Sequence, residues 1–220
     1  MSAATGAMTT VAGNLDGWKS VDGAALEANF HGLEGVVVAN DGTVYAAETS
    51  HKVRRIAAAD AAVTTLAGAY FGYADGTGAS ALFKYPRALA FNAAQSTMIV
   101  TDYQNNRLRK VVIATGVTTT IAGDGSDASR GTVDTDAGGA RAATVHHPKF
   151  IAAAKADSYY FSEGIVVRKL LADLSIHTVA GKSSGGMTTK DGFGGASGFS
   201  SIFGLSIDPA TEYLYVMDQK

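Results

Sequence analysis

The chain of 220 residues has 46% hydrophobic and 17% charged residues, a composition that excludes an intrinsically disordered protein. Its net charge of −2 offers no basic excess for phosphate contacts, which disfavours nucleic-acid binding. The absence of cysteine excludes disulfides and thiolate metal sites, and the 26 glycines against 3 prolines indicate short strands joined by tight turns.

The chain begins with small and polar residues, from Met1 to Met8, and this segment lacks the apolar run of a signal peptide. No stretch approaches the roughly 20 apolar residues that a membrane-spanning helix needs. The sequence therefore predicts neither a signal peptide nor a transmembrane segment within these residues, and it leaves the compartment open.

The first recurring element is a short string that ends in Ala-Gly. Its final glycine occurs about every 55 residues, a spacing typical of repeat architectures. These glycines are Gly13, Gly68, Gly123 and Gly181. We expect a single domain over 1–220, with units over approximately 9–63, 64–117 and 118–176 and an incomplete unit over 177–220.

An Asp-Gly loop comes next, and a phenylalanine follows the aspartate eight positions later. The aspartates of these loops are Asp22, Asp75 and Asp191. The third unit departs from the pattern, because it has Ala137-Gly138 in place of Asp-Gly, with Asp134 and Asp136 nearby. In a tight turn the glycine supplies a positive φ and the aspartate bonds to its own backbone.

Three apolar strings complete each unit and are typical of strands. The first lies at 35–39, 88–91, 150–153 and 204–207, the second ends at Glu48, Asp102, Glu163 or Asp218, and the third contains Arg54, Arg109 or Arg168. Each unit therefore has about four short strands, and no helical period is evident. One such unit cannot bury both of its faces, whereas units stacked around an axis can, which predicts an all-β propeller.

The second unit resembles the NHL repeat. The resemblance lies in the string 64–68, in 74–79 with Phe83 and Pro86, and in 100–102 and 105–110. The series recurs in phase over nearly the whole chain. The resemblance implies that 88–91 is an inner strand and that 64–68 closes the preceding blade as its outer strand. It also implies that the loops near 14–30, 69–83, 124–147 and 182–199 lie on one face, which we call the loop face.

NHL-type propellers commonly have six blades, whereas about four are present in this chain. The chain opens with an outer strand and ends at 218–220, just after the second strand of the fourth unit. We therefore expect a part of a larger, six-bladed propeller that the remaining blades or a second copy would complete. The rival interpretation is a compact four-bladed ring with one short blade.

The recurring charged residues have two interpretations. Loop aspartates can bind calcium, because hard cations prefer clustered oxygens, but the same Asp-Gly pairs form turns, and we favour the turns. The strand-end acids and the third-strand arginines recur with the blades, which favours pairing within each blade over a ligand site. We therefore predict no cofactor, with calcium as the alternative.

Histidines and loop aromatics supply the remaining candidates. His146 and His147 precede Pro148, and His31 occupies the position that matches His146. Two such imidazoles could bind zinc or act as general bases, but their units are not adjacent and no His-x-His or His-Glu-x-x-His motif is present, so we favour exposed or capping histidines. The loop aromatics fit a binding face and packing between blades equally well. The candidate binding residues on the loop face are Trp18, Asp22, Tyr70, Tyr73, Asp75, His146, His147 and Asp191.

No nucleophile motif or phosphate-binding loop is present, so we favour a protein that is not an enzyme. The leading hypothesis is a non-enzymatic scaffold that binds a protein or a glycan through the loop face. The alternative is a metal-dependent propeller enzyme of the lactonase or lyase type, although the inner strands are almost wholly apolar. RNA binding ranks third, because the loops carry more acids than bases.

Overall fold

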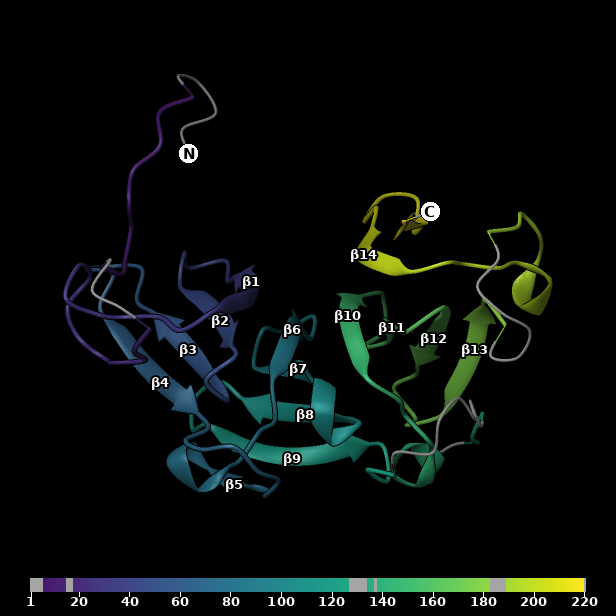
Figure 1. Cartoon of the computed structure of the whole chain (residues 1–220), viewed down its shortest axis with the longest axis horizontal. Coiled ribbons are helices and arrows are strands. Elements are labelled where there is room, and N and C mark those ends of the chain that lie inside the picture. Colours follow the sequence, from purple (N-terminus) through teal and green to yellow (C-terminus); the bar gives the residue numbers. More distant parts are fainter. Residues whose placement is uncertain (1–5, 15–17, 127–133, 137, 183–188, 220) are drawn as a thin grey trace.

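The computed structural model describes residues 6–14, 18–126, 134–136, 138–182 and 189–219, and its strands form four antiparallel sheets. Figure 1 shows the sheets arranged along an arc, with the strands of residues 33–67 at one end and those of residues 202–218 at the other. Within each sheet the four main strands, or the two in the last sheet, follow chain order from the concave side outward. Each sheet is thus one blade of a β-propeller, and the predicted all-β propeller is confirmed.

The blades are numbered in chain order. Blade one contains β1 (Leu33–Val38), β2 (Val44–Glu48), β3 (Lys52–Ile56) and β4 (Val63–Ala67). Blade two contains β6 (Pro86–Phe91), β7 (Thr97–Asp102), β8 (Arg107–Val112) and β9 (Val117–Ala122), with the short β5 (Gly76–Thr77) outside β9. Blade three contains β10 (Pro148–Ala153), β11 (Tyr159–Glu163), β12 (Val166–Leu170) and β13 (Ile176–Ala180). Within the described residues, blade four contains β14 (Ile202–Ile207) and β15 (Leu214–Asp218).

The second, third and fourth sequence repeats each supply the outer strand of one blade and inner strands of the next. The expectation that the chain opens with an outer strand is wrong, because the first Ala-Gly string, at 10–13, forms no strand. β4 comes from the start of the second unit but pairs with β3 of blade one. β9 and β13 occupy the same outer position in blades two and three. The prediction that the Ala-Gly string closes the preceding blade is therefore confirmed, and the loop after it crosses to the next blade.

The loops between the blades contain short 3-10 turns. They are η1 (Gly78–Ser80), η3 (Gly139–Ala142) and η4 (Gly194–Ala196), and a further turn, η2 (Tyr103–Asn105), follows β7. Within the described part of the chain, no helix has the length and apolar character needed to cross a membrane.

Apolar side chains fill the seams between blades. On β7, Met98 and Val100 face blade one, where they join a core that contains Tyr45 and Phe83. Ile99, between them on the strand, joins the core on the side of blade three. Successive residues of a strand point to opposite faces of the sheet, so one strand contributes to two seams. This alternation holds neighbouring blades face to face.

The glycine of the Ala-Gly string is required by a close approach of two backbones. Gly68, Gly123 and Gly181 have φ values of +96°, +91° and +89°. A Cβ atom on Gly123 would lie 2.2 Å from the carbonyl oxygen of Asn106, in the turn between the second and third strands. Gly68 and Gly181 face equivalent carbonyls at 2.3 Å. The strongest sequence signal of the repeat thus marks where the outer strand passes over this turn.

Candidate functional site

Each of the three blades with four strands holds a fully buried arginine of its third strand between two acids. In blade two, Arg109 Nη1 lies 2.8 Å from Asp102 Oδ2, and Arg109 Nη2 lies 2.9 Å from Asp75 Oδ1. We call such a set of three residues a brace. The other two braces are Glu48–Arg54–Asp22 and Glu163–Arg168–Asp134. The predicted pairing of the recurring acids and arginines within each blade is observed.

The loop aspartate of each brace also binds the outer strand. Asp75 Oδ1 accepts hydrogen bonds from the backbone N–H and the hydroxyl of Thr120, both at 2.9 Å. Burial raises the pKa of Asp75, but these bonds and the charge of Arg109 outweigh burial and leave it below its ordinary value. Asp22 is held in the same way by Thr65 and Arg54. Both candidate residues are thus engaged inside their blades, and a ligand-binding role for them stays a prediction.

The brace of blade three uses Asp134. Its Oδ1 accepts hydrogen bonds from the backbone N–H and the hydroxyl of Thr178, at 2.8 and 2.9 Å. The sequence pattern aligns Ala137-Gly138 with the Asp-Gly pairs of the other units, and Ala137 lies outside the described residues. The third unit therefore keeps the brace but takes its acid from an earlier position in the loop.

The strand-end acid of each brace accepts a backbone hydrogen bond from the segment that leads into the inner strand. The backbone N–H of Lys84 donates to Asp102 Oδ1 at 2.7 Å, and Asn105 Nδ2 donates to Asp102 Oδ2 at 2.8 Å. Burial raises the pKa of Asp102, and Arg109 and these donors only partly offset that effect. In blade three, burial raises the pKa of Glu163 to about 7. These carboxyls are buried away from solvent, so their contacts stabilise the blade.

An aromatic and basic band crosses the loop face above the braces. At its blade-one end, the ring of Trp18 meets that of His31 edge to face, with centroids 5.5 Å apart. The ring of His51 then contacts Phe71 at 5.4 Å and Tyr85 at 4.8 Å. Burial, and secondarily the charge of His31, lowers the pKa of His51.

The band continues over blade two to the entry of blade three. Lys84 Nζ lies 4.8 Å from the ring centroid of Phe71. Tyr103 stacks on His147 with centroids 4.8 Å apart, and the guanidinium of Arg87 lies 4.2 Å from the Tyr103 ring. We call this set the aromatic band; it consists of Trp18, His31, His51, Phe71, Lys84, Tyr85, Arg87, Tyr103 and His147.

A polar cavity of about 350 Å³ lies within this band. It is lined by Lys84, Gln104, Asn105, Asn106, Arg107, Gly125 and His147. Arg107 is oriented by its bonds to the carbonyls of Asn105 and Asp124, both at 2.8 Å. The lining offers amide groups and positive charge, which suit a ligand that carries hydroxyl or carboxylate oxygens.

The loop aromatics are all exposed, but they differ in their contacts. Trp18 is 84% exposed, Tyr70 79% and Phe71 58%, which makes them available to a partner. Tyr73 is 44% exposed, and the guanidinium carbon of Arg107 lies 3.8 Å from the centroid of the Tyr73 ring. The hydroxyl of Tyr73 lies 3.1 Å from Thr120 Oγ1, so this tyrosine combines an exposed face with contacts inside blade two.

The remaining candidates lie at the far side of the loop face. The rings of His146 and His147 are 4.2 Å apart, and His147 contributes to the cavity. Asp191 lies in the loop before β14 and is exposed, outside the aromatic band. In the described part of the chain, no group of three or more His, Asp or Glu side chains could hold a metal ion. The metal-dependent enzyme and the RNA-binding protein stay hypotheses that rank after the binding scaffold.

The candidate binding residues chosen from the sequence leave out seven members of the aromatic band. They are His31, His51, Phe71, Lys84, Tyr85, Arg87 and Tyr103. Their positions carry one usable signal: Tyr85 and His147 both precede a proline at the entry of an inner strand, and both have positive φ, +53° and +45°. Residues held in this uncommon conformation are worth inspection as functional positions.

No protein-family model matches the chain, and no curated protein matches it in sequence. Solved structures match its fold. An auxiliary nutrient-binding protein from Bacteroides thetaiotaomicron matches with a TM-score of 0.66 and 16% identity, over 87% of this chain and 46% of that one. The nidogen/laminin complex matches with a TM-score of 0.55 and 15% identity, over 84% of this chain and 56% of that one. A gluconolactonase from Xanthomonas campestris matches with a TM-score of 0.55 and 12% identity, over 89% of this chain and 56% of that one. These likenesses show the β-propeller fold, and the chain spans about half the length of the structures it matches.

Proposed function

We propose that this chain belongs to an NHL-type propeller that binds a protein or glycan partner through the aromatic band of its loop face and through Tyr70, the neighbour of Phe71 in the chain. The observation that carries the proposal is the exposure of Trp18, Tyr70 and Phe71 on the loops that precede blades one and two. The braces and the Ala-Gly turns account for the residues that recur. The exposed aromatics do not recur in register, as expected of residues that serve one particular ligand.

The chemistry of the band fits such partners. Aromatic rings offer large, rigid apolar faces that stack on sugar rings or on apolar side chains. Lys84 and Arg87 lie against rings within the same band, where they can contact acidic or hydroxyl groups of the ligand. The polar cavity beside them can receive one such group. Two neighbours in fold, a nutrient-binding protein and nidogen with laminin, are compatible with a binding role, but fold alone does not determine function.

The test is a binding screen of the 220-residue chain on a glycan array and on a panel of purified extracellular-matrix and cell-surface proteins. We expect a hit from wild type to weaken at least about tenfold in Trp18→Ala and in Tyr70→Ala, because hot-spot aromatics dominate interfaces. Tyr213→Ala is the matched control, since Tyr213 is 68% exposed but lies in the β14–β15 turn.

Two results would count against the proposal. One is a hit that all three variants bind as tightly as wild type, since binding would then use another surface. The other is release of product from a lactone substrate by the calcium-loaded chain, which would favour the enzyme hypothesis. Circular dichroism of each variant checks that its fold is intact.

A further inference from the structure

The polar cavity of the loop face carries positive charge without a counter-charge in its lining. Two permanent cations, Lys84 and Arg107, line it, and no acid does. In the described part of the chain, neither of these side chains forms an ion pair. Asp124 offers Arg107 only its carbonyl oxygen, while its carboxylate accepts hydrogen bonds from Ser126. The lining therefore favours an anionic ligand, because a recess lined by one sign of charge attracts the other.

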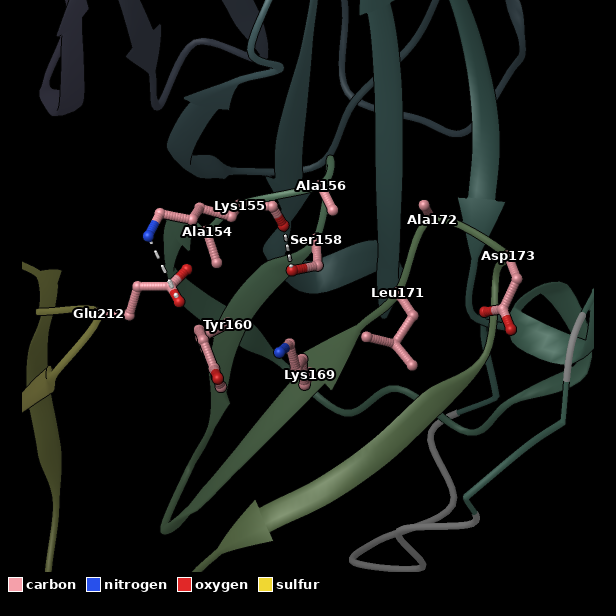
Figure 2. A pocket seen from close by; sticks show the side chains of 10 residues that line it. All are labelled: Ala154, Lys155, Ala156, Ser158, Tyr160, Lys169, Leu171, Ala172, Asp173 and Glu212. Carbon is pink, nitrogen blue, oxygen red and sulfur yellow. Dashed lines mark hydrogen bonds and ion pairs between the residues drawn. The ribbon is translucent and has the colours of Figure 1, made fainter. Parts of the chain in front are cut away.

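The cavity of about 460 Å³ in Figure 2 has a balanced lining instead. Its two lysines are matched by two acids, and the four residues are Lys155, Lys169, Asp173 and Glu212. Lys155 Nζ lies 3.6 Å from Glu212 Oε2, and Lys169 Nζ lies 4.9 Å from the ring centroid of Tyr160. Unbalanced positive charge thus distinguishes the loop-face cavity from this one.

The turn that forms one wall of the loop-face cavity departs from the repeat. It spans 103–106 in blade two, between the paired residues Asp102 and Arg107. The corresponding turns span 49–51 in blade one and 164–165 in blade three. The turn of blade two is therefore the longest of the three. A blade forms without these additional residues, so they are free to serve a ligand.

Buried amides hold this turn in place. Asn105 Nδ2 donates to the carbonyl of Gly72 at 2.8 Å. Asn106 Nδ2 donates to the carbonyl of Ser126 at 3.0 Å, and Asn106 Oδ1 accepts the backbone N–H of His147 at 2.9 Å. The two asparagines thus tie the turn to the loops that precede blades two and three. A ligand would meet walls that are already ordered, which lowers the entropic cost of binding.

We propose that this cavity binds a uronic-acid residue of an acidic glycan, whose carboxylate interacts with the charges of Lys84 and Arg107. Each terminal nitrogen of Arg107 uses one N–H for a backbone carbonyl, which leaves a second N–H on each. The exposed side chain of Gln104 lines the same cavity and can donate to and accept from sugar hydroxyls.

A sugar acid matches this lining better than an acidic amino-acid side chain does. It presents a carboxylate and several hydroxyls on one ring, whereas a glutamate or aspartate offers no hydroxyl to the amide groups. The cavity of about 350 Å³ lies at the lower end of the range of small-ligand sites, roughly 300–1,000 Å³, as suits a single ring. The inference rests on the proposed function, because it names the class of glycan bound beside the aromatic band.

The test is a titration of the ¹⁵N-labelled 220-residue chain, followed by NMR, with methyl β-D-glucuronide and methyl β-D-glucoside. The two sugars differ only at C6, which is a carboxylate in the first and a hydroxymethyl group in the second. We expect the glucuronide to cause saturable shifts of the side-chain amides of Gln104, Asn105 and Asn106. The glucoside should bind at least about tenfold more weakly, because it lacks the charge-assisted bonds. Equal binding of the two sugars, or no saturable shift with the glucuronide, would overturn the proposal.

A third probe, N-acetyl-L-glutamic acid amide, distinguishes the source of the carboxylate. It carries the same charge as the glucuronide on a protein-like side chain, without the hydroxyls. We expect it to bind at least about tenfold more weakly than the glucuronide. Binding as tight as that of the glucuronide would assign the cavity to an acidic side chain of a protein partner and overturn the glycan assignment.

Two protein variants locate the site. Lys84→Gln should weaken the glucuronide at least about tenfold, while the backbone bonds of residue 84 to Asp102 and Gln104 remain. Lys155→Gln is the matched control, because it removes one lysine from the balanced cavity of Figure 2 and should bind like wild type. Unchanged binding by Lys84→Gln, or an equal loss in both variants, would contradict the site.

The outcomes separate this inference from the proposed function. A partner that requires Trp18 and Tyr70, together with no binding of the glucuronide, would overturn the inference and leave the proposed function standing. Binding of the glucuronide in the cavity, together with partners that ignore Trp18 and Tyr70, would support the cavity and overturn the proposed use of the aromatic band.

Discussion

The guanidinium of Arg109 and the carboxyl of Asp102 lie 2.8 Å apart, and neither side chain has any exposure to solvent. They are seven positions apart in the chain, and the turn between β7 and β8 brings them together. Asp75, from the loop before the blade, completes the brace on the other side of the guanidinium. One buried arginine therefore joins the inner, middle and outer parts of a blade to the loop that precedes it.

Replacing Arg109 tests how much the brace contributes to the free energy of unfolding. Arg109→Met keeps an apolar stem but leaves the Asp102 carboxyl buried without its cation. We expect a loss of about 3–5 kcal/mol in the free energy of unfolding, measured by urea denaturation, as for other buried pairs that lose one partner. Lys110→Met is the control, since Lys110 is the exposed neighbour on β8 and should change stability by no more than about 0.5 kcal/mol. Equal effects of the two variants would show that the brace is not a major source of stability.

The acid of the third brace predicts a pH dependence. Burial raises the pKa of Glu163 from 4.5 to about 7, against the opposing charge of Arg168. Between these two values the folded protein keeps a proton that the unfolded chain has released, so stability falls as the pH rises through this window. The slope is at most about 1.4 kcal/mol per pH unit for one group.

The measurement is a series of urea denaturations from pH 4.5 to 7.5 on wild type and Glu163→Gln. Glutamine does not titrate, so the variant should lose the part of the decline that Glu163 causes and show a flatter profile. Asp173→Asn is the control, because Asp173 is on the surface and its pKa lies below this window. Parallel profiles for wild type and Glu163→Gln would mean that this carboxyl keeps an ordinary pKa.

The glycine of the Ala-Gly string predicts a steric effect. In Gly123→Ala the new methyl group would lie 2.2 Å from the carbonyl oxygen of Asn106, at a φ of +91°. We expect the free energy of unfolding to fall by at least about 3 kcal/mol, because the cost of the backbone strain adds to the cost of the clash. Gly78→Ala is the matched control: its φ is +55° with nothing within 4 Å, so only about 1–2 kcal/mol of left-handed strain is expected. Thermal unfolding of the two variants decides the point, and similar midpoints would exclude the clash.

The sequence revealed the blade architecture because its signals are local. Gly68, Gly123 and Gly181 each stand where the backbone needs a positive φ, and alternation along β7 sends Met98 and Ile99 to different seams. A positive φ or a buried face constrains the residue type at one position of each unit. The same residue types therefore recur in the sequence at the spacing of the units.

Only the tertiary structure decided which side chains meet across the loops. Asp134, rather than a residue at the aligned Ala137-Gly138, completes the third brace, because a carboxylate reaches Arg168 and Thr178 from several loop positions. Tyr73 and Tyr70 look alike in sequence and both are exposed, yet Arg107 lies over the ring of Tyr73, whose hydroxyl also meets Thr120. The aromatic band and the polar cavity combine residues from separate units. Their partnership depends on how the blades pack side by side, and no period along the chain records it.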